Sequence, residues 1–70
     1  MDELDAFGKR VKELRQKLSL SQEELAAECD LDRTYISGIE RGQRNVSLKN
    51  IYKLSRALNV SPSDLFVEDR

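Results

Sequence analysis

Apolar residues near the start of the chain recur every three or four positions, at Phe7, Val11, Leu14 and Leu18. This spacing places them along one face of a helix. Gly8 lies inside that helix, where glycine is less favourable than alanine. Either another helix approaches closely at Gly8, or the chain tolerates a small defect there. The pattern therefore predicts a first helix with one buried face.

Two shorter helices are predicted next, separated by a tight turn. Ser21 and Glu24 form a capping box at the start of the first of them. Asp30 occupies the turn, which needs a left-handed backbone that Asp tolerates better than most residues do. Asp32 is expected to cap the next helix, and Gly42 to end it. The apolar residues assigned to the buried faces of this pair are Leu25, Ala26, Cys29, Leu31, Ile36 and Ile39.

A fourth and a fifth helix are predicted in the C-terminal third. Ser47 caps the fourth helix, and Asn59 ends it. Ser61 and Pro62 open the fifth, because proline is favoured at the first helical position and Asp64 completes a capping box. The residues that the fourth helix is expected to bury are Leu48, Ile51, Leu54, Ala57 and Leu58. No segment alternates with a period of two, so we expect a compact, all-α, five-helix fold without strands.

The size and composition of the chain indicate one small globular domain, spanning residues 1–70. A domain of this size buries only about 60% of its unfolded surface, so dimerisation would add stability. The sequence is 36% charged and 39% hydrophobic, which is typical of a soluble helical protein. It contains no apolar run of membrane length, no signal segment and a single cysteine. We therefore expect a cytoplasmic protein.

Charge is unevenly distributed along the chain, although the net charge is only −1. The segment 33–56 carries six Lys or Arg residues and one acid, a net charge of +5, whereas the rest of the chain carries −6. One segment can therefore face phosphates while the remainder stays acidic. The simpler alternative is a basic face that is only solvated.

Residues 21–42, with two short helices and a tight turn, resemble the Cro/CI-type (phage-repressor-like) helix-turn-helix. The resemblance extends from about residue 7 to residue 66. The run 32–42 followed by Arg44-Asn45 is similar to the small controller proteins that regulate restriction–modification operons. The resemblance implies a five-helix, lambda-repressor-like domain, with the motif at about 21–42 and its second helix in the major groove of DNA.

The start of the predicted third helix carries the candidate base-reading residues Arg33, Thr34 and Ser37. Arginine suits bidentate pairing with guanine, and threonine offers a hydroxyl to a base edge and a methyl group to thymine. Ser37 could reach either a base or a phosphate. Gly38 has no side chain and would let the helix lie close to the DNA. The alternative is that Arg33 is only solvated and Ser37 has no specific role.

Phosphate contacts, which position a protein on DNA without reading sequence, are expected from five residues. Gln22 stands at the start of the second helix, where backbone N–H groups and the helix dipole favour a phosphate. The resemblance implies a phosphate contact from its side chain as well. Arg44, Asn45 and Lys49 cluster around the loop before the fourth helix. Tyr35 could hydrogen-bond a phosphate or, in the alternative, pack on the fourth helix.

The resemblance also implies a partly buried ion pair between Arg15 and Glu40, which would fix the orientation of the third helix. The alternative is two exposed charges that never meet. Cys29 is expected to be a small buried residue rather than a redox sensor, since its neighbours are acidic and its spacing places it in the core.

A single recognition helix reads few bases, so we expect a two-fold homodimer on palindromic DNA. The C-terminal apolar residues exceed what a helix end of this size should bury, although they could all complete the core. The candidate dimer contacts are Tyr52, Val60, Leu65, Phe66 and Val67.

These features predict a sequence-specific transcriptional regulator, and the resemblance favours a restriction–modification controller. A phage-type or chromosomal repressor, or an antitoxin of the same fold, is the alternative. A helical protein-interaction module fits less well, because a partner-binding face should be less basic. An enzyme is not expected, since the chain has no histidine, phosphate loop or metal-ligand spacing. The expected partners are duplex operator DNA, a second copy of the chain and, as a further candidate, RNA polymerase. We expect no cofactor, metal, small-molecule ligand or membrane contact.

Overall fold

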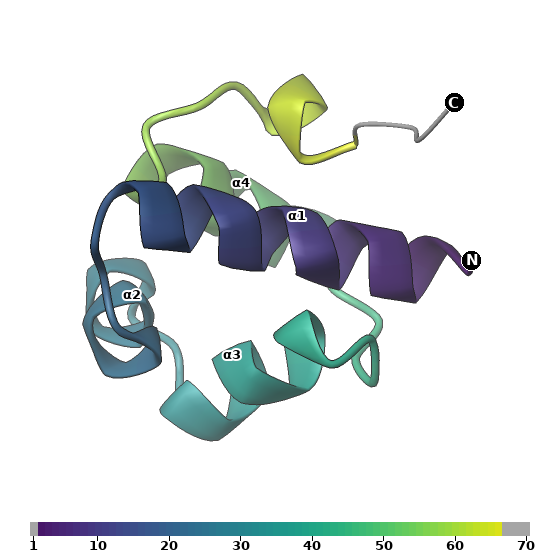
Figure 1. The fold of residues 1–70 in the computed structure, drawn as a ribbon, viewed down its shortest axis with the longest axis horizontal. Coiled ribbons are helices and arrows are strands. Elements are labelled where there is room, and N and C mark those ends of the chain that lie inside the picture. The colour runs from purple at the N-terminus through teal and green to yellow at the C-terminus, as the bar shows by residue number, and fades with distance from the viewer. Residues whose placement is uncertain (1, 67–70) are drawn as a thin grey trace.

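The computed structural model describes residues 2–66, which form four α-helices followed by a short 3-10 turn (Figure 1). The helices are α1 (Glu3–Lys17), α2 (Gln22–Cys29), α3 (Arg33–Glu40) and α4 (Leu48–Ala57). The all-α class is therefore confirmed. The predicted fifth helix is wrong, because Pro62–Leu65 forms the 3-10 turn η1. The capping box between Ser61 and Asp64 is present, but it opens a segment of four residues, a length typical of 3-10 turns.

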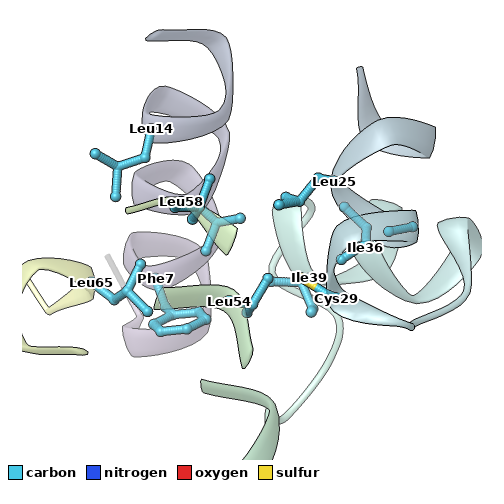
Figure 2. Close-up of a cluster of buried hydrophobic side chains, with 11 residues drawn as sticks. Phe7, Leu14, Leu25, Cys29, Ile36, Ile39, Leu54, Leu58 and Leu65 are labelled. Carbon is cyan, nitrogen blue, oxygen red and sulfur yellow. The ribbon is translucent and has the colours of Figure 1, made fainter. Parts of the chain in front are cut away.

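The first helix, α1, lies between α3 and η1 (Figure 1). In Figure 1, α3 lies on one side of α1 and η1 on the other, and both contact it. The fourth helix, α4, contacts α2 and η1. The apolar faces of these elements meet in one core, part of which is shown in Figure 2. Its fully buried residues come from all four helices and include Val11, Leu25, Ile36 and Leu54.

Two apolar residues that the sequence assigns to buried faces are exposed. Leu48 is 70% exposed and Leu18 is 42% exposed. Leu48 is the first residue of α4, and Leu18 follows the last residue of α1. Helical spacing predicts facing poorly at such positions, because the chain leaves the helix axis there. Leu31, Ile51 and Ala57 are partly buried against the core, as the pattern predicts.

All four α-helices end in the same kind of turn, in which one residue adopts a left-handed backbone. These residues are Ser19, Asp30, Gly42 and Asn59, with φ between 57° and 73°. In each turn the following N–H donates to a carbonyl five residues back, as from Gln43 to Gly38 at 2.9 Å. This is the Schellman pattern of helix ends. The sequence predicts the turns at Asp30, Gly42 and Asn59 but gives no sign of the one at Ser19.

Close contact between α1 and α3 explains the glycine inside the first helix. A Cβ atom at Gly8 would lie 2.1 Å from the carbonyl oxygen of Ile39 and 3.0 Å from that of Glu40. The backbones of the two helices therefore meet at Gly8, and only a residue without a side chain fits. Of the two explanations that the sequence leaves open, close approach of a second helix is the one observed.

Candidate nucleic-acid interface

Capping and turn residues that are recognisable in the sequence define the helix pair α2–α3. The hydroxyl of Ser21 accepts from the Glu24 N–H at 3.0 Å, and the Glu24 carboxylate accepts from the Ser21 N–H at 2.8 Å. The predicted capping box is therefore present. The left-handed backbone at Asp30 then turns the chain, and α3 begins at Arg33 and packs against α2.

The first two residues of α3, Arg33 and Thr34, are both exposed to solvent. Asp32 is the N-cap residue of this helix, as predicted, but its side chain makes no capping hydrogen bond. Its carboxylate instead accepts a hydrogen bond from the Thr34 hydroxyl. Because the hydroxyl proton is engaged in this way, Thr34 offers a ligand its lone pairs and its methyl group.

Ser37 has the opposite hydrogen-bonding role. Its hydroxyl accepts from Nη1 of Arg41 at 2.5 Å, so its own proton is available to a phosphate or base acceptor. Nε of Arg41 also donates to Gln43 at 3.3 Å. Ser37 is half-buried, and its hydroxyl lies one turn beyond the exposed start of α3.

Tyr35 faces α4 rather than solvent. Its ring packs against the core, and its hydroxyl accepts from Nδ2 of Asn50 at 3.2 Å. The guanidinium carbon of Arg44 lies 5.6 Å from the ring centroid, within cation–π range. The structure thus agrees with the alternative that Tyr35 packs on the fourth helix, and a phosphate contact by its hydroxyl stays a prediction.

The loop between α3 and α4 carries the other basic candidates. Arg44, Asn45 and Lys49 are all exposed. Ser47 caps α4 by accepting from the Asn50 N–H at 3.2 Å, which places Lys49 in the first turn of that helix. Arg44 reaches the ring of Tyr35, so this loop packs against α3.

Behind α3, Arg15 and Glu40 form a bidentate ion pair. Nε and Nη2 of Arg15 donate to the two carboxylate oxygens of Glu40 at 2.7 and 3.0 Å. The side chains are only 11% and 3% exposed, so the pair is largely withdrawn from water. The hydrogen bond that Arg15 donates to Glu40 raises the pKa of Arg15, and this effect outweighs the opposing effect of burial. The pair ties α1 to the last residue of α3.

Gln22 joins this network, a contact that sequence analysis does not reveal. Its Nε2 donates to Oε1 of Glu40 at 3.0 Å, and it is the first residue of α2. The amide has a second N–H, which can donate to a phosphate from a position that Glu40 fixes. No local sequence pattern predicts the contact between Gln22 and Glu40, because only the packing of the helices brings the two residues together.

The candidate dimer residues do not all lie at the surface. Tyr52 and Phe66 are 47% and 57% exposed, and Val60 is half-buried. Leu65 is only 1% exposed, so its assignment to a dimer contact is wrong. The turn η1 folds this side chain into the core of the domain. Val67 lies outside the described residues.

Leu48 is a further exposed apolar residue of α4. It lies four residues before Tyr52, so both side chains share one face of α4. The ring of Phe66 packs on that of Phe7, with centroids 5.4 Å apart. We call Leu48, Tyr52 and Phe66 the exposed apolar set.

Cys29 is 3% exposed, in the core as predicted. Burial, with a smaller effect of Glu28, raises the pKa of its thiol, which stays protonated at neutral pH. Within residues 2–66, no group of three or more His, Cys, Asp or Glu side chains could hold a metal ion. None of the helices described above combines the length and apolarity needed to cross a bilayer.

The order and geometry of α2, the turn and α3 match a known family. Its model, described as helix-turn-helix, covers residues 11–65. The chain belongs to the helix-turn-helix family. This confirms the resemblance seen in the sequence. Within this helix-turn-helix domain, α2 and α3 form the motif, and α3 occupies the position of the recognition helix.

Similar proteins include several restriction–modification controllers. Control protein C.BamHI from Bacillus amyloliquefaciens is 63% identical over 60 residues, which are 84% of this chain and 74% of that protein. The solved controller C.AhdI from Aeromonas hydrophila is 57% identical with a TM-score of 0.89, over 90% of this chain and 96% of the other. The controller C.Esp1396I, solved as a tetramer with its natural 35-base-pair operator, is 38% identical with a TM-score of 0.84, over 94% and 87% of the two chains.

Proposed function

We propose that this protein is a sequence-specific DNA-binding regulator of transcription that controls a restriction–modification operon, and that it is not an enzyme. The observation that carries the proposal is the exposed start of α3 in a helix-turn-helix arrangement, with Arg33 and Thr34 at the surface. The 63% identity to a control protein supports the class of operon.

Arg33 and Thr34 read bases in different ways. Arg33 donates to O6 and N7 of guanine, for which its guanidinium is suited. Thr34 accepts rather than donates, because Asp32 engages its hydroxyl proton. Its partner is then an exocyclic amino group, N4 of cytosine or N6 of adenine. Ser37, whose proton is available, donates to a base or phosphate acceptor.

The backbone contacts surround this reading turn. Gln22 donates to one phosphate from the start of α2, in an orientation held by Glu40. Arg44, Asn45 and Lys49 contact a second phosphate from the loop and the first turn of α4. These contacts set register and affinity without carrying sequence information.

A homodimer places two such helices on a palindrome, with half-sites about 34–36 Å apart. The exposed apolar set supports a dimer face made by α4 and the end of η1. The relative C.Esp1396I forms a tetramer on its operator. Pairing of two dimers of this protein on DNA would be consistent with the same dimer face. A regulator of this kind acts in the cytoplasm with the DNA, where RNA polymerase is a candidate further partner.

The test is selection from a random duplex DNA library at physiological salt, followed by sequencing of the bound pool. The proposal expects an enriched palindrome with half-sites about one helical turn apart. Sedimentation of the protein alone should show a dimer, and Leu48→Arg should shift it toward monomer. A pool without an enriched sequence would overturn the proposal and favour a protein-interaction module.

A further inference from the structure

Gly38 lies inside the recognition helix, and its backbone conformation does not require a glycine. It is the sixth of the eight residues of α3, and Gly42 is the glycine with positive φ in the described chain. Glycine in a helix interior destabilises the helix relative to alanine. Something other than backbone conformation therefore accounts for its presence.

The space above Gly38 is filled by one side chain. A Cβ atom at this position would lie 2.8 Å from Cγ, 3.3 Å from Nε and 3.6 Å from Cδ of Arg44. Its three nearest neighbours are thus all atoms of Arg44. Gly8 differs, because the atoms that a Cβ would meet there belong to the backbone of α3. The sequence suggested that Gly38 lets DNA approach, but the protein's own arginine arm occupies this surface.

The end of α3 brings Arg44 to this place. The N–H groups of Gly42 and Gln43 donate to the carbonyls of Ile39 and Gly38 at 3.0 and 2.9 Å. This Schellman turn folds the loop back along α3. The Arg44 guanidinium then lies over the ring of Tyr35, 5.6 Å from its centroid.

Tyr35 and Gly38 form the two halves of a cradle for the arginine. They are three residues apart and therefore neighbours on one side of α3. Tyr35 is held in turn by Asn50 of α4 at 3.2 Å. The aliphatic part of Arg44 crosses the helix at Gly38, and its charged end lies over the aromatic ring.

We propose that Gly38 is a positioning residue for Arg44, one that keeps the guanidinium pre-ordered against the recognition helix for its contact with DNA. The inference rests on the proposed function and adds a specific part to it. Ordering a long side chain before binding lowers the entropy lost on association. A methyl group at position 38 would displace the arm from the helix and return Arg44 to many rotamers.

The first test uses the protein without DNA. In the wild type, the heteronuclear NOE of the Arg44 Nε–H group should report an ordered side chain, unlike that of the exposed Arg33. Gly38→Ala should lower the Arg44 value to that of Arg33, while the melting temperature stays the same or rises. An Arg44 signal that is already mobile in the wild type, or unchanged in the variant, would overturn the proposal. This result does not depend on DNA binding.

The second test measures affinity for the duplex enriched from the random library. Gly38→Ala and Arg44→Ala should each weaken binding about tenfold, and the double variant should lose about tenfold rather than a hundredfold. Lys17→Ala is the control, because it removes one positive charge, as Arg44→Ala does. Lys17 is exposed on the side of α1 that carries Arg10, so this variant should bind as the wild type does.

The outcomes separate the two proposals. Independent losses in the double variant would mean that Gly38 acts on DNA directly and would overturn the positioning role. Wild-type affinity in Arg44→Ala or in Gly38→Ala would overturn it as well and leave the proposed function standing. A wild-type protein that prefers no duplex sequence would instead overturn the proposed function.

Discussion

The two sides of α3 are built on different principles. Its inner side meets α1 backbone to backbone at Gly8, where a Cβ would lie 2.1 Å from a carbonyl oxygen. Its last residue, Glu40, is tied to Arg15 and is 3% exposed. On the outer side, the three atoms nearest to a Cβ at Gly38 all belong to the Arg44 side chain, and Arg33 and Thr34 are exposed.

The difference shows how one short helix can be fixed in the fold on one side and carry exchangeable side chains on the other. On the inner side the neighbouring atoms are backbone and buried charge, which move only at a cost in stability. On the outer side the neighbours are long or exposed side chains, which can be exchanged at little cost in stability. We expect inner substitutions to change stability and outer ones to change DNA binding.

Loss of the buried ion pair should have the largest effect. Glu40→Ala leaves the Arg15 guanidinium largely buried without its partner, and we expect a loss of about 3–5 kcal/mol in the free energy of unfolding. Urea denaturation followed by circular dichroism measures it. The double variant Arg15→Met/Glu40→Leu should be less destabilised than Glu40→Ala. A loss below about 1 kcal/mol would mean that the pair behaves like an exposed one.

Gly8→Ala should be next in size. Its methyl group would overlap the Ile39 carbonyl oxygen, so α1 must shift away from α3, at a cost of about 1–3 kcal/mol in stability. Thermal melts of this variant and of Gly38→Ala compare the same substitution on the two sides of α3. Equal melting temperatures for the two variants would contradict the distinction between the inner and outer sides.

Arg33→Ala tests the outer side directly. Binding to the selected duplex should weaken by about 1–3 kcal/mol, and the preference at one base position should relax. The melting temperature should not change, because Arg33 is exposed. Fluorescence anisotropy on duplexes with each base at that position provides the measurement. Unchanged affinity and specificity would remove Arg33 from base reading.

Lys49→Ala should produce a smaller and different effect on the outer side. Lys49 is exposed in the first turn of α4 and is assigned to a phosphate. Its loss should weaken all duplex sequences alike and reduce the slope of log K against log salt by about 1. A salt titration of the wild type and the variant tests this, and identical slopes would mean that Lys49 contacts no phosphate.

Ser19→Gly should have the smallest effect. Ser19 lies on neither side of α3. Ser19 has a φ of 58° at the end of α1, a conformation that glycine adopts without steric cost. A left-handed backbone costs a residue with a side chain about 1–2 kcal/mol, and the larger entropy loss of glycine offsets about 0.5–1 kcal/mol of this, so we expect a net gain of about 0.5–1 kcal/mol in the free energy of unfolding. Ser19→Ala, which retains the strain, is the control. If glycine gives no gain over alanine, the left-handed backbone at this position costs nothing.

Sequence patterns predicted the elements of this fold well and their ends less well. The capping box at Ser21 and the turn at Asp30 were visible because both depend on neighbouring residues. Leu48 and Leu65 were placed wrongly, one in the core and one at the surface. Both errors come from helix ends, where the path of the chain, rather than the spacing of apolar residues, decides which way a side chain faces.

The candidate site also has residues that the sequence predicted and contacts that only the structure shows. Arg33 and Thr34 could be found from the sequence because they follow a recognisable turn at the start of a helix. The hydrogen bond from Gln22 to Glu40 and the placement of Arg44 over Tyr35 could not. These contacts join residues on separate elements, and no local pattern records which side chains meet when the elements pack.

The sequence by itself determined the four α-helices, a helix-turn-helix and a basic segment, because capping, helical spacing and charge are properties of neighbouring residues. It also predicted a fifth helix where the structure has the 3-10 turn η1. Only the tertiary structure decided why two of its glycines lie inside helices. Gly8 admits the backbone of another helix, and Gly38 admits an arginine from the following loop. The physical reason is that a missing side chain carries no information about what fills its space, which depends on how the helices and loops pack around it.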